Sequence, residues 1–316
     1  MKQNITKQNH LLDTKKILLD KFDISLRYAE LGDVENPPII LLHGVPENLN
    51  SWYAVAPLFA KNNRVLAIDW PGFGGSNPLA ASEDYTSRNF AEVVVDFMDA
   101  LKIDNAIIMA SDIALLPALL VGLEYPERVS RLIVMDGLPF QRPQYASWEL
   151  NSFVKKGSLR AKFMIKWFPR LATQIGYQKG FYKGHSIPAD VLEKFLTDGN
   201  NKTNQNAFAS YFQNFHLGQN YFEERAHLLK TPVLVVWGKY DRFINVKLAY
   251  EIVEKLPNAR LEIIDKAGHY VHMDKPRELV DAVNKFLSEE PQRVLKDTNE
   301  HPFKPLYPEV AELHVK

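Results

Sequence analysis

The fold of this chain is decided by the stretch AIIMASDIALL, residues 106–116. Its first six residues are apolar or small, which predicts a fully buried strand of a parallel sheet. The residues after Asp112 are mostly apolar as far as Leu123 and predict a helix. Asp112 therefore stands at a tight turn between a buried strand and a helix, with the small residues Ala110 and Ala114 two positions to either side.

This position is typical of a catalytic nucleophile. A side chain at such a bend projects from the edge of the sheet near the positive end of the following helix, and small neighbours let the backbone approach closely. Ser111 does not fit the pattern, because its corresponding neighbours would be Met109 and Ile113. The alternative interpretation of Asp112 is a helix N-cap, whose carboxylate accepts hydrogen bonds from backbone N–H groups.

The segments on either side predict an α/β fold. Strands alternating with helices imply a mostly parallel central sheet with helices on both faces. The predicted strands lie within 17–28 and at 37–44, 63–70, 131–140, 231–238 and 259–265.

The alternation stops after residue 140, where helical and aromatic-rich sequence predicts an inserted helical lid. We expect a discontinuous core over 1–140 and 228–316, with the lid at 141–227. The polar, proline-containing segment from about residue 291 is expected to be a tail.

Three further segments follow predicted strands and carry candidate functional groups. Asp241, in WGKYD, and His269, in AGHY, both lie at strand ends, where α/β sheets place functional groups. Asp241 as a turn residue and His269 as a structural histidine are the alternatives. The third segment is HGVP, residues 43–46, in which the backbone N–H of Val45 is positioned to form an oxyanion hole together with that of Ile113. His43 is expected to be structural.

The chain resembles the α/β-hydrolase superfamily, in its epoxide hydrolase and haloalkane dehalogenase branch, over about residues 15–288. The resemblance rests on HGVP (43–46), DWPGFGGS (69–76), YPERVSRLIVMD (125–136), WGKYD (237–241) and AGHYVHMDKP (267–276). It implies that Asp112 is the nucleophile, His269 the base that activates water, and Asp241 the acid that orients His269. Asp136 is the alternative acid.

A carboxylate nucleophile points to substrates with an sp³ carbon. It displaces a leaving group to form an alkyl ester, which an activated water then hydrolyses, so epoxides and alkyl halides fit. Ile113 stands where haloalkane dehalogenases place tryptophan and fluoroacetate dehalogenases arginine, which argues against halides. Ala110, Ala114 and Leu115 replace the glycines that are usual around the family's nucleophile.

Epoxide hydrolases protonate the opening ring with lid tyrosines, so the lid is the expected source of an acid. By resemblance Tyr211 is the best placed, and Tyr177, Tyr145 and Tyr182 compete for a second role. Trp148 is a further candidate for substrate contact. Packing within an aromatic lid is the alternative explanation for each of them.

The composition limits the classes of molecule that this protein is expected to bind. Lys plus Arg and Asp plus Glu both number 38, which gives no attraction to nucleic acid or an anionic membrane. There is no cysteine, no apolar leader and no metal-ligand spacing, so we expect a cytoplasmic enzyme without metal or cofactor that acts on a small, largely apolar organic molecule. An oligomer is not indicated. A dehalogenase or other α/β-hydrolase, and a ligand-binding derivative of the fold, are the alternative functions.

Overall fold

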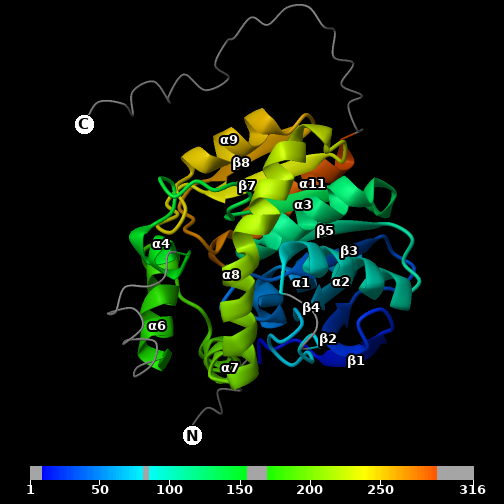
Figure 1. The fold of residues 1–316 in the computed structure, drawn as a ribbon, viewed down its shortest axis with the longest axis horizontal. Coiled ribbons are helices and arrows are strands. Elements are labelled where there is room, and N and C mark those ends of the chain that lie inside the picture. Colours follow the sequence, from blue (N-terminus) through cyan, green and yellow to red (C-terminus); the bar gives the residue numbers. More distant parts are fainter. Residues whose placement is uncertain (1–8, 81–84, 155–168, 290–316) are drawn as a thin grey trace, which may run out of the picture.

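A central sheet organises the chain in the computed structural model, which describes residues 9–80, 85–154 and 169–289 (Figure 1). The strand order is β1-β2-β4-β3-β5-β6-β7-β8; β1 and β4 each pair with β2 antiparallel, and the other pairs are parallel. The strands are β1 (Thr14–Leu19), β2 (Ile24–Leu31), β3 (Pro38–Leu42), β4 (Arg64–Ile68), β5 (Ala106–Ser111), β6 (Val129–Met135), β7 (Val233–Gly238) and β8 (Ala259–Ile264).

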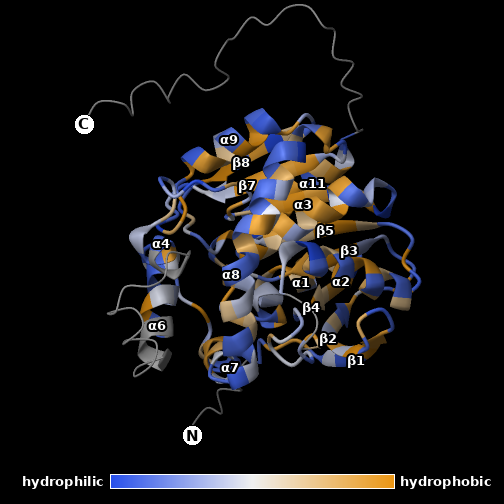
Figure 2. Ribbon diagram, in the orientation of Figure 1, coloured by the Kyte–Doolittle hydropathy of each residue, from blue (hydrophilic) through white to orange (hydrophobic). Residues whose placement is uncertain are grey.

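The parallel strands β3 to β8 are apolar runs because both faces of the sheet are covered. Along β5, Ile108 and Ala110 join one hydrophobic cluster, whereas Ile107 and Met109 join a second cluster on the opposite face. This alternation is the two-residue period of an extended strand. Figure 2 shows hydrophobic residues concentrated in these central strands and in the helix that follows β5.

Helices cover the two faces in separate groups. Residues of α2 (Ser87–Ala100), α3 (Leu115–Glu124) and α9 (Lys247–Lys255) pack into the first cluster, and residues of α1 (Ala56–Phe59) and α11 (Pro276–Ser288) into the second. In α11 the buried residues are Leu279, Val283 and Phe286, spaced so that they share one helical face. The predicted arrangement, a mostly parallel sheet with helices on both faces, is observed.

The insertion between β6 and β7 is helical, as predicted, and consists in its described part of α4 (Trp148–Val154), α6 (Pro169–Gly180), α7 (Ala189–Gly199) and α8 (Lys202–Arg225). The long helix α8 contacts α2 and α3, so it packs on the helical layer that contains the helix following Asp112 (Figure 1). The limits 141–227 stay a prediction, and the expected tail from about 291 lies outside the described residues. No helix within the described ranges has the length and hydropathy needed to cross a membrane.

Candidate active site

Asp112 lies at the turn between β5 and α3 in a strained backbone conformation. Its φ is +56°, in the left-handed region that aspartate and asparagine tolerate better than most residues. A short 3₁₀ turn, Asp112–Ala114, leads directly into α3. The end of β3 approaches so closely that a Cβ on Gly44 would lie 2.6 Å from the Cβ of Asp112, so this neighbour has to be glycine.

The two carboxylate oxygens of Asp112 face different groups. Oδ2 accepts a hydrogen bond from the Val45 N–H at 2.9 Å, and Oδ1 lies 3.8 Å from Nε2 of His269. The Asp112 side chain is 12% exposed. Burial raises the pKa of its carboxyl, and the charge of His269 and the N–H groups of Val45 and Ile113 act in the opposite direction. The predicted oxyanion-hole donors therefore converge on the Asp112 carboxylate.

His269 is held by Asp241. Its Nδ1 donates to Oδ2 of Asp241 at 2.9 Å, and the other oxygen, Oδ1, accepts from the N–H groups of Phe243 (2.7 Å) and Ile244 (3.0 Å). The Asp241 side chain is fully buried. The three side chains thus form a line from Asp241 through His269 to Asp112, in the order that the sequence predicted.

Asp136, the alternative acid, lies at the end of β6 beside this line. Its Oδ1 accepts a hydrogen bond from the Gly238 N–H at 3.1 Å, while Oδ2 is buried without a partner among the described residues. Burial first, and then the charge of Asp241, raise the pKa of the Asp136 carboxyl well above its usual range. His269 donates its hydrogen bond to Asp241 instead, and Asp136 affects the histidine only through its charge.

The model of the alpha/beta hydrolase fold family matches residues 37–276. The chain belongs to the α/β-hydrolase fold family. The match spans the turn after β3, the Asp112 turn, the whole insertion and the loops that carry Asp241 and His269. The predicted family and fold class are confirmed.

Relatives of this α/β-hydrolase include more than one activity. Epoxide hydrolase 4 from Homo sapiens is 26% identical over 290 residues, covering 85% of this chain and 77% of that protein. The 2-hydroxy-6-oxo-6-phenylhexa-2,4-dienoate hydrolase from Burkholderia cepacia is 27% identical over 274 residues, covering 85% and 91%. The solved structure of the enzyme of that name from Rhodococcus sp. strain RHA1 superimposes with a TM-score of 0.75 at 17% identity, covering 88% of this chain and 100% of that one, and shows the shared fold.

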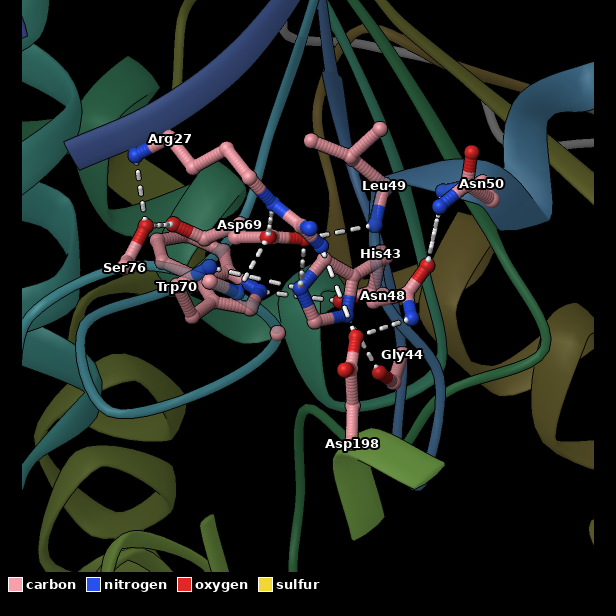
Figure 3. Close-up of polar contacts among 12 residues, drawn as sticks. Arg27, His43, Gly44, Asn48, Leu49, Asn50, Asp69, Trp70, Ser76 and Asp198 are labelled. Carbon is pink, nitrogen blue, oxygen red and sulfur yellow. Dashed lines mark hydrogen bonds and ion pairs between the residues drawn. The ribbon is translucent and has the colours of Figure 1, made fainter. Parts of the chain in front are cut away.

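His43 fixes the turn that carries the Val45 N–H of the α/β-hydrolase site (Figure 3). Its Nδ1 hydrogen-bonds to the Gly44 carbonyl oxygen at 2.6 Å, and its Nε2 accepts from the Trp70 N–H at 3.3 Å. Trp70 Nε1 in turn donates to the His43 carbonyl at 2.9 Å. Since Nε2 accepts a hydrogen bond and therefore carries no proton, His43 is neutral, which agrees with a pKa that burial lowers. The bond between Val45 and Pro46 is cis.

Asp69 holds the chain that follows this turn. Its fully buried carboxylate forms an ion pair with Arg27 of β2 and accepts from the N–H groups of Leu49 and Gly75, both at 2.8 Å (Figure 3). The DWPGFGGS loop therefore contributes structure, because the carboxylate of its first residue is buried in an ion pair and hydrogen bonds.

The helical insertion reaches the same region through Asp198, near the end of α7. Oδ2 of Asp198 accepts from Nδ2 of Asn48 at 2.8 Å and lies 3.5 Å from Arg27 Nη2, and Oδ1 accepts from Lys194 Nζ at 2.7 Å (Figure 3). Asn48 is three residues beyond Val45. A carboxylate of the insertion is thus hydrogen-bonded to the segment that also carries Val45, the predicted oxyanion-hole donor. Asp198 was missed by the sequence analysis, since an isolated helical aspartate gives no signal.

Two of the expected tyrosines are buried close to Asp112, but each hydroxyl contacts a backbone carbonyl. Tyr211 of α8 bonds to Ser87 Oγ at 2.9 Å and donates to the Ile113 carbonyl at 3.2 Å. Tyr177 of α6 donates to the Pro46 carbonyl at 3.0 Å.

The remaining aromatic candidates lie further out. The Tyr182 ring packs 5.0 Å from that of Tyr240, and the two line a surface hollow beside Asp241. Tyr145 is half-buried against the first hydrophobic cluster. Trp148, at the start of α4, is 69% exposed, which is not what we expected of a residue that contacts substrate. Within 9–80, 85–154 and 169–289, no group of three or more histidine, aspartate or glutamate side chains is placed to bind a metal ion.

We expect Asp241→Asn to lower the pKa of His269 more than Asp112→Asn does. Burial alone lowers that pKa, but the charge and hydrogen bond of Asp241, followed by the charges of Asp112 and Asp136, raise it to about 10. NMR titration of the imidazole in the parent and both variants measures the change. The reverse order of the two decreases would contradict the assignment of Asp241 as the main partner.

Proposed function

We propose that this α/β-hydrolase is an epoxide hydrolase-like enzyme in which Asp112 attacks an epoxide carbon and forms a covalent alkyl ester. The observation that carries the proposal is the placement of the two Asp112 oxygens, Oδ2 on the Val45 N–H at 2.9 Å and Oδ1 toward His269 at 3.8 Å. Oδ1 is the attacking atom. Oδ2 becomes the ester carbonyl oxygen, which already accepts a hydrogen bond from the Val45 N–H.

Ester formation prepares His269 for the second step. In the free enzyme the neighbouring carboxylates hold the pKa of His269 at about 10, so the imidazole is protonated at neutral pH. Alkylation removes the charge of Asp112, so this pKa falls and His269 can lose its proton. The neutral imidazole then takes a proton from a water that attacks the ester carbon, with Asp241 stabilising the imidazolium that forms.

The N–H groups of Val45 and Ile113 stabilise the negative charge on Oδ2 in the tetrahedral intermediate. Its collapse releases a diol and restores the Asp112 carboxylate. A carboxylate nucleophile favours this route over ordinary ester hydrolysis, because attack on an acyl carbon would give an anhydride rather than an alkyl ester. The relation to epoxide hydrolase 4 supports the same choice.

The substrate we propose is a small, largely apolar organic epoxide. Tyr270, whose ring packs against His269, forms an apolar cluster with Tyr177, Phe181 and Phe195 of the insertion. Apolar walls with a few polar groups are the usual composition of a small-molecule site. We also propose a cytoplasmic location, without cofactor, metal or nucleic-acid partner.

The decisive experiment is to trap the ester. His269→Gln should still allow attack but should prevent water activation, so intact-mass analysis after incubation with a panel of small epoxides is expected to show the protein plus one epoxide. The double variant Asp112→Asn/His269→Gln is the matched control and should stay unmodified. Absence of an adduct from every epoxide in the panel would overturn the proposal, and an adduct formed with loss of halide from haloalkanes alone would favour a dehalogenase.

A further inference from the structure

Ring opening leaves a strongly basic oxygen that needs a proton, and three buried tyrosines lie in the field of Asp112. Burial and the charge of Asp112 both raise the pKa values of Tyr177, Tyr211 and Tyr270. A phenol has a single hydrogen to donate. Tyr177 gives that hydrogen to the Pro46 carbonyl and Tyr211 gives its own to the Ile113 carbonyl, so both lid hydroxyls are already committed.

Tyr270 differs from the other two in its hydroxyl and in its origin. It follows His269 directly and belongs to the core rather than to the insertion. The residue is 3% exposed, and its hydroxyl has no hydrogen-bond partner in the part of the chain that the structure describes. Burial first, and then the charges of Glu47, Asp112 and Asp241, hold its pKa well above the usual range. The group is therefore a neutral phenol, and its ring packs against that of His269.

The Tyr270 ring is fixed in this position. Its centroid lies 5.2 Å from that of His269 and 5.1 Å from that of Phe181 in the insertion. A Cβ on Gly180 would lie 2.3 Å from Cε2 of Tyr270, so the backbone of the insertion packs closely against the ring at this glycine. The Gly180 carbonyl also accepts from the His269 N–H at 2.7 Å. The insertion thus holds Tyr270 and His269 together.

We propose that the Tyr270 hydroxyl is the acid that protonates the leaving oxygen when Asp112 opens the epoxide. The inference rests on the proposed function and names the proton source that the lid tyrosines were expected to supply. An alkoxide is more basic than a phenolate, so the phenol can act as an acid toward the oxygen that leaves the opened ring.

The proton balance closes with groups already in the site. Oδ1 of Asp112 forms a bond to the epoxide carbon, the carbon–oxygen bond breaks, and its electron pair takes the Tyr270 proton. The Tyr270 phenolate then recovers a proton from the His269 imidazolium, which leaves His269 neutral, as hydrolysis requires. Water gives one proton to His269 and its hydroxide to the ester carbon. Collapse of the intermediate leaves Asp112 as a carboxylic acid, which passes its proton to the departing alkoxide.

The test compares the rate of ester formation in His269→Gln with that in His269→Gln/Tyr270→Phe, by rapid quench and intact mass. Loss of the phenol should slow ester formation by about 10²- to 10⁴-fold, the usual contribution of a general acid. In the otherwise unaltered enzyme, Tyr270→Phe should make ester formation rate-limiting without slowing ester breakdown. A purely structural role of the ring would leave both steps nearly intact, because phenylalanine keeps the packing.

Two control variants make the test specific. Tyr53 contacts the same apolar cluster without a described link to Asp112, so Tyr53→Phe should leave ester formation unchanged. Tyr211→Phe should slow ester formation less than Tyr270→Phe does. If the His269→Gln protein forms the ester and Tyr270→Phe does not slow it, or if Tyr211→Phe carries the loss, the role of Tyr270 is overturned while the proposed function stands. If no ester forms in His269→Gln itself, the proposed function has failed first.

Discussion

Replacing Asp112 by asparagine is expected to reduce turnover by about 10⁴- to 10⁶-fold, the loss typical of removing a nucleophile. The substitution deletes the attacking oxygen and little else. Asparagine tolerates the left-handed φ of +56° as aspartate does, so the turn into α3 should persist. Steady-state hydrolysis of the epoxide that gives the His269→Gln adduct measures the effect, and turnover within tenfold of the parent would remove Asp112 from the mechanism.

The same variant should be at least as stable as the parent at neutral pH. Burial raises the pKa of Asp112 in the folded protein, so ionisation costs stability as the pH rises above the carboxyl's usual value of about 3.9. An amide carries no charge and avoids this cost. Thermal unfolding from pH 4 to pH 8 should therefore show a relative gain for the variant that grows with pH. A large decrease in melting temperature would mean that activity was lost through unfolding.

The second large effect is expected on stability, from Asp69→Ala. This buried carboxylate pairs with Arg27 and accepts from the Leu49 and Gly75 N–H groups. Among the described residues, its removal leaves Arg27 with only the 3.5 Å ion pair to Asp198 and leaves both N–H donors without this acceptor. Breaking a buried ion pair from one side typically costs about 3–5 kcal/mol. Urea unfolding of the parent and variant measures the difference in the free energy of unfolding.

An exposed ion pair provides the matched control for Asp69. Asp265 and Lys239 lie 3.5 Å apart with side chains 58% and 55% exposed, so Asp265→Ala should cost no more than about 1 kcal/mol. Similar losses for the two variants would show that the Asp69 network contributes little beyond a surface pair.

The fold could be predicted from the sequence because its main signals are local. Apolar runs such as AIIMAS mark strands with both faces buried, and each lies within the described sheet. The turn at Asp112 was also predictable, since the small residues Ala110 and Ala114 and the strand-to-helix change surround it. The bounds of the insertion were harder to predict, because helical and aromatic sequence does not mark the residue at which the core ends.

Only the folded structure distinguishes the two candidate acids, Asp136 and Asp241. Asp136 and Asp241 follow the neighbouring strands β6 and β7, so sequence order places both at the same edge of the sheet. What separates them is the direction of their oxygens: Asp241 reaches His269 Nδ1 at 2.9 Å, whereas Asp136 accepts from the Gly238 N–H.

The tyrosines show a similar limit. The lid pattern directed attention to Tyr211 and Tyr177, but only the contacts reveal that both hydroxyls bond to backbone carbonyls. Tyr270 gave no signal in the sequence, because an aromatic residue after a histidine is indistinguishable from a packing residue. The free hydroxyl is a property of the folded arrangement of several segments.

The bond between Asp198 of α7 and Asn48 has a consequence for protein engineering. Exchanging helical insertions between relatives is an obvious way to alter selectivity in such a scaffold. In this chain, a transplanted insertion without an acceptor at the Asp198 position would leave Asn48 and Arg27 without that contact, only three residues beyond the Val45 donor. A functional chimera therefore has to carry Arg27, Asn48 and Asp198 as one inherited unit, even though they are far apart in the sequence.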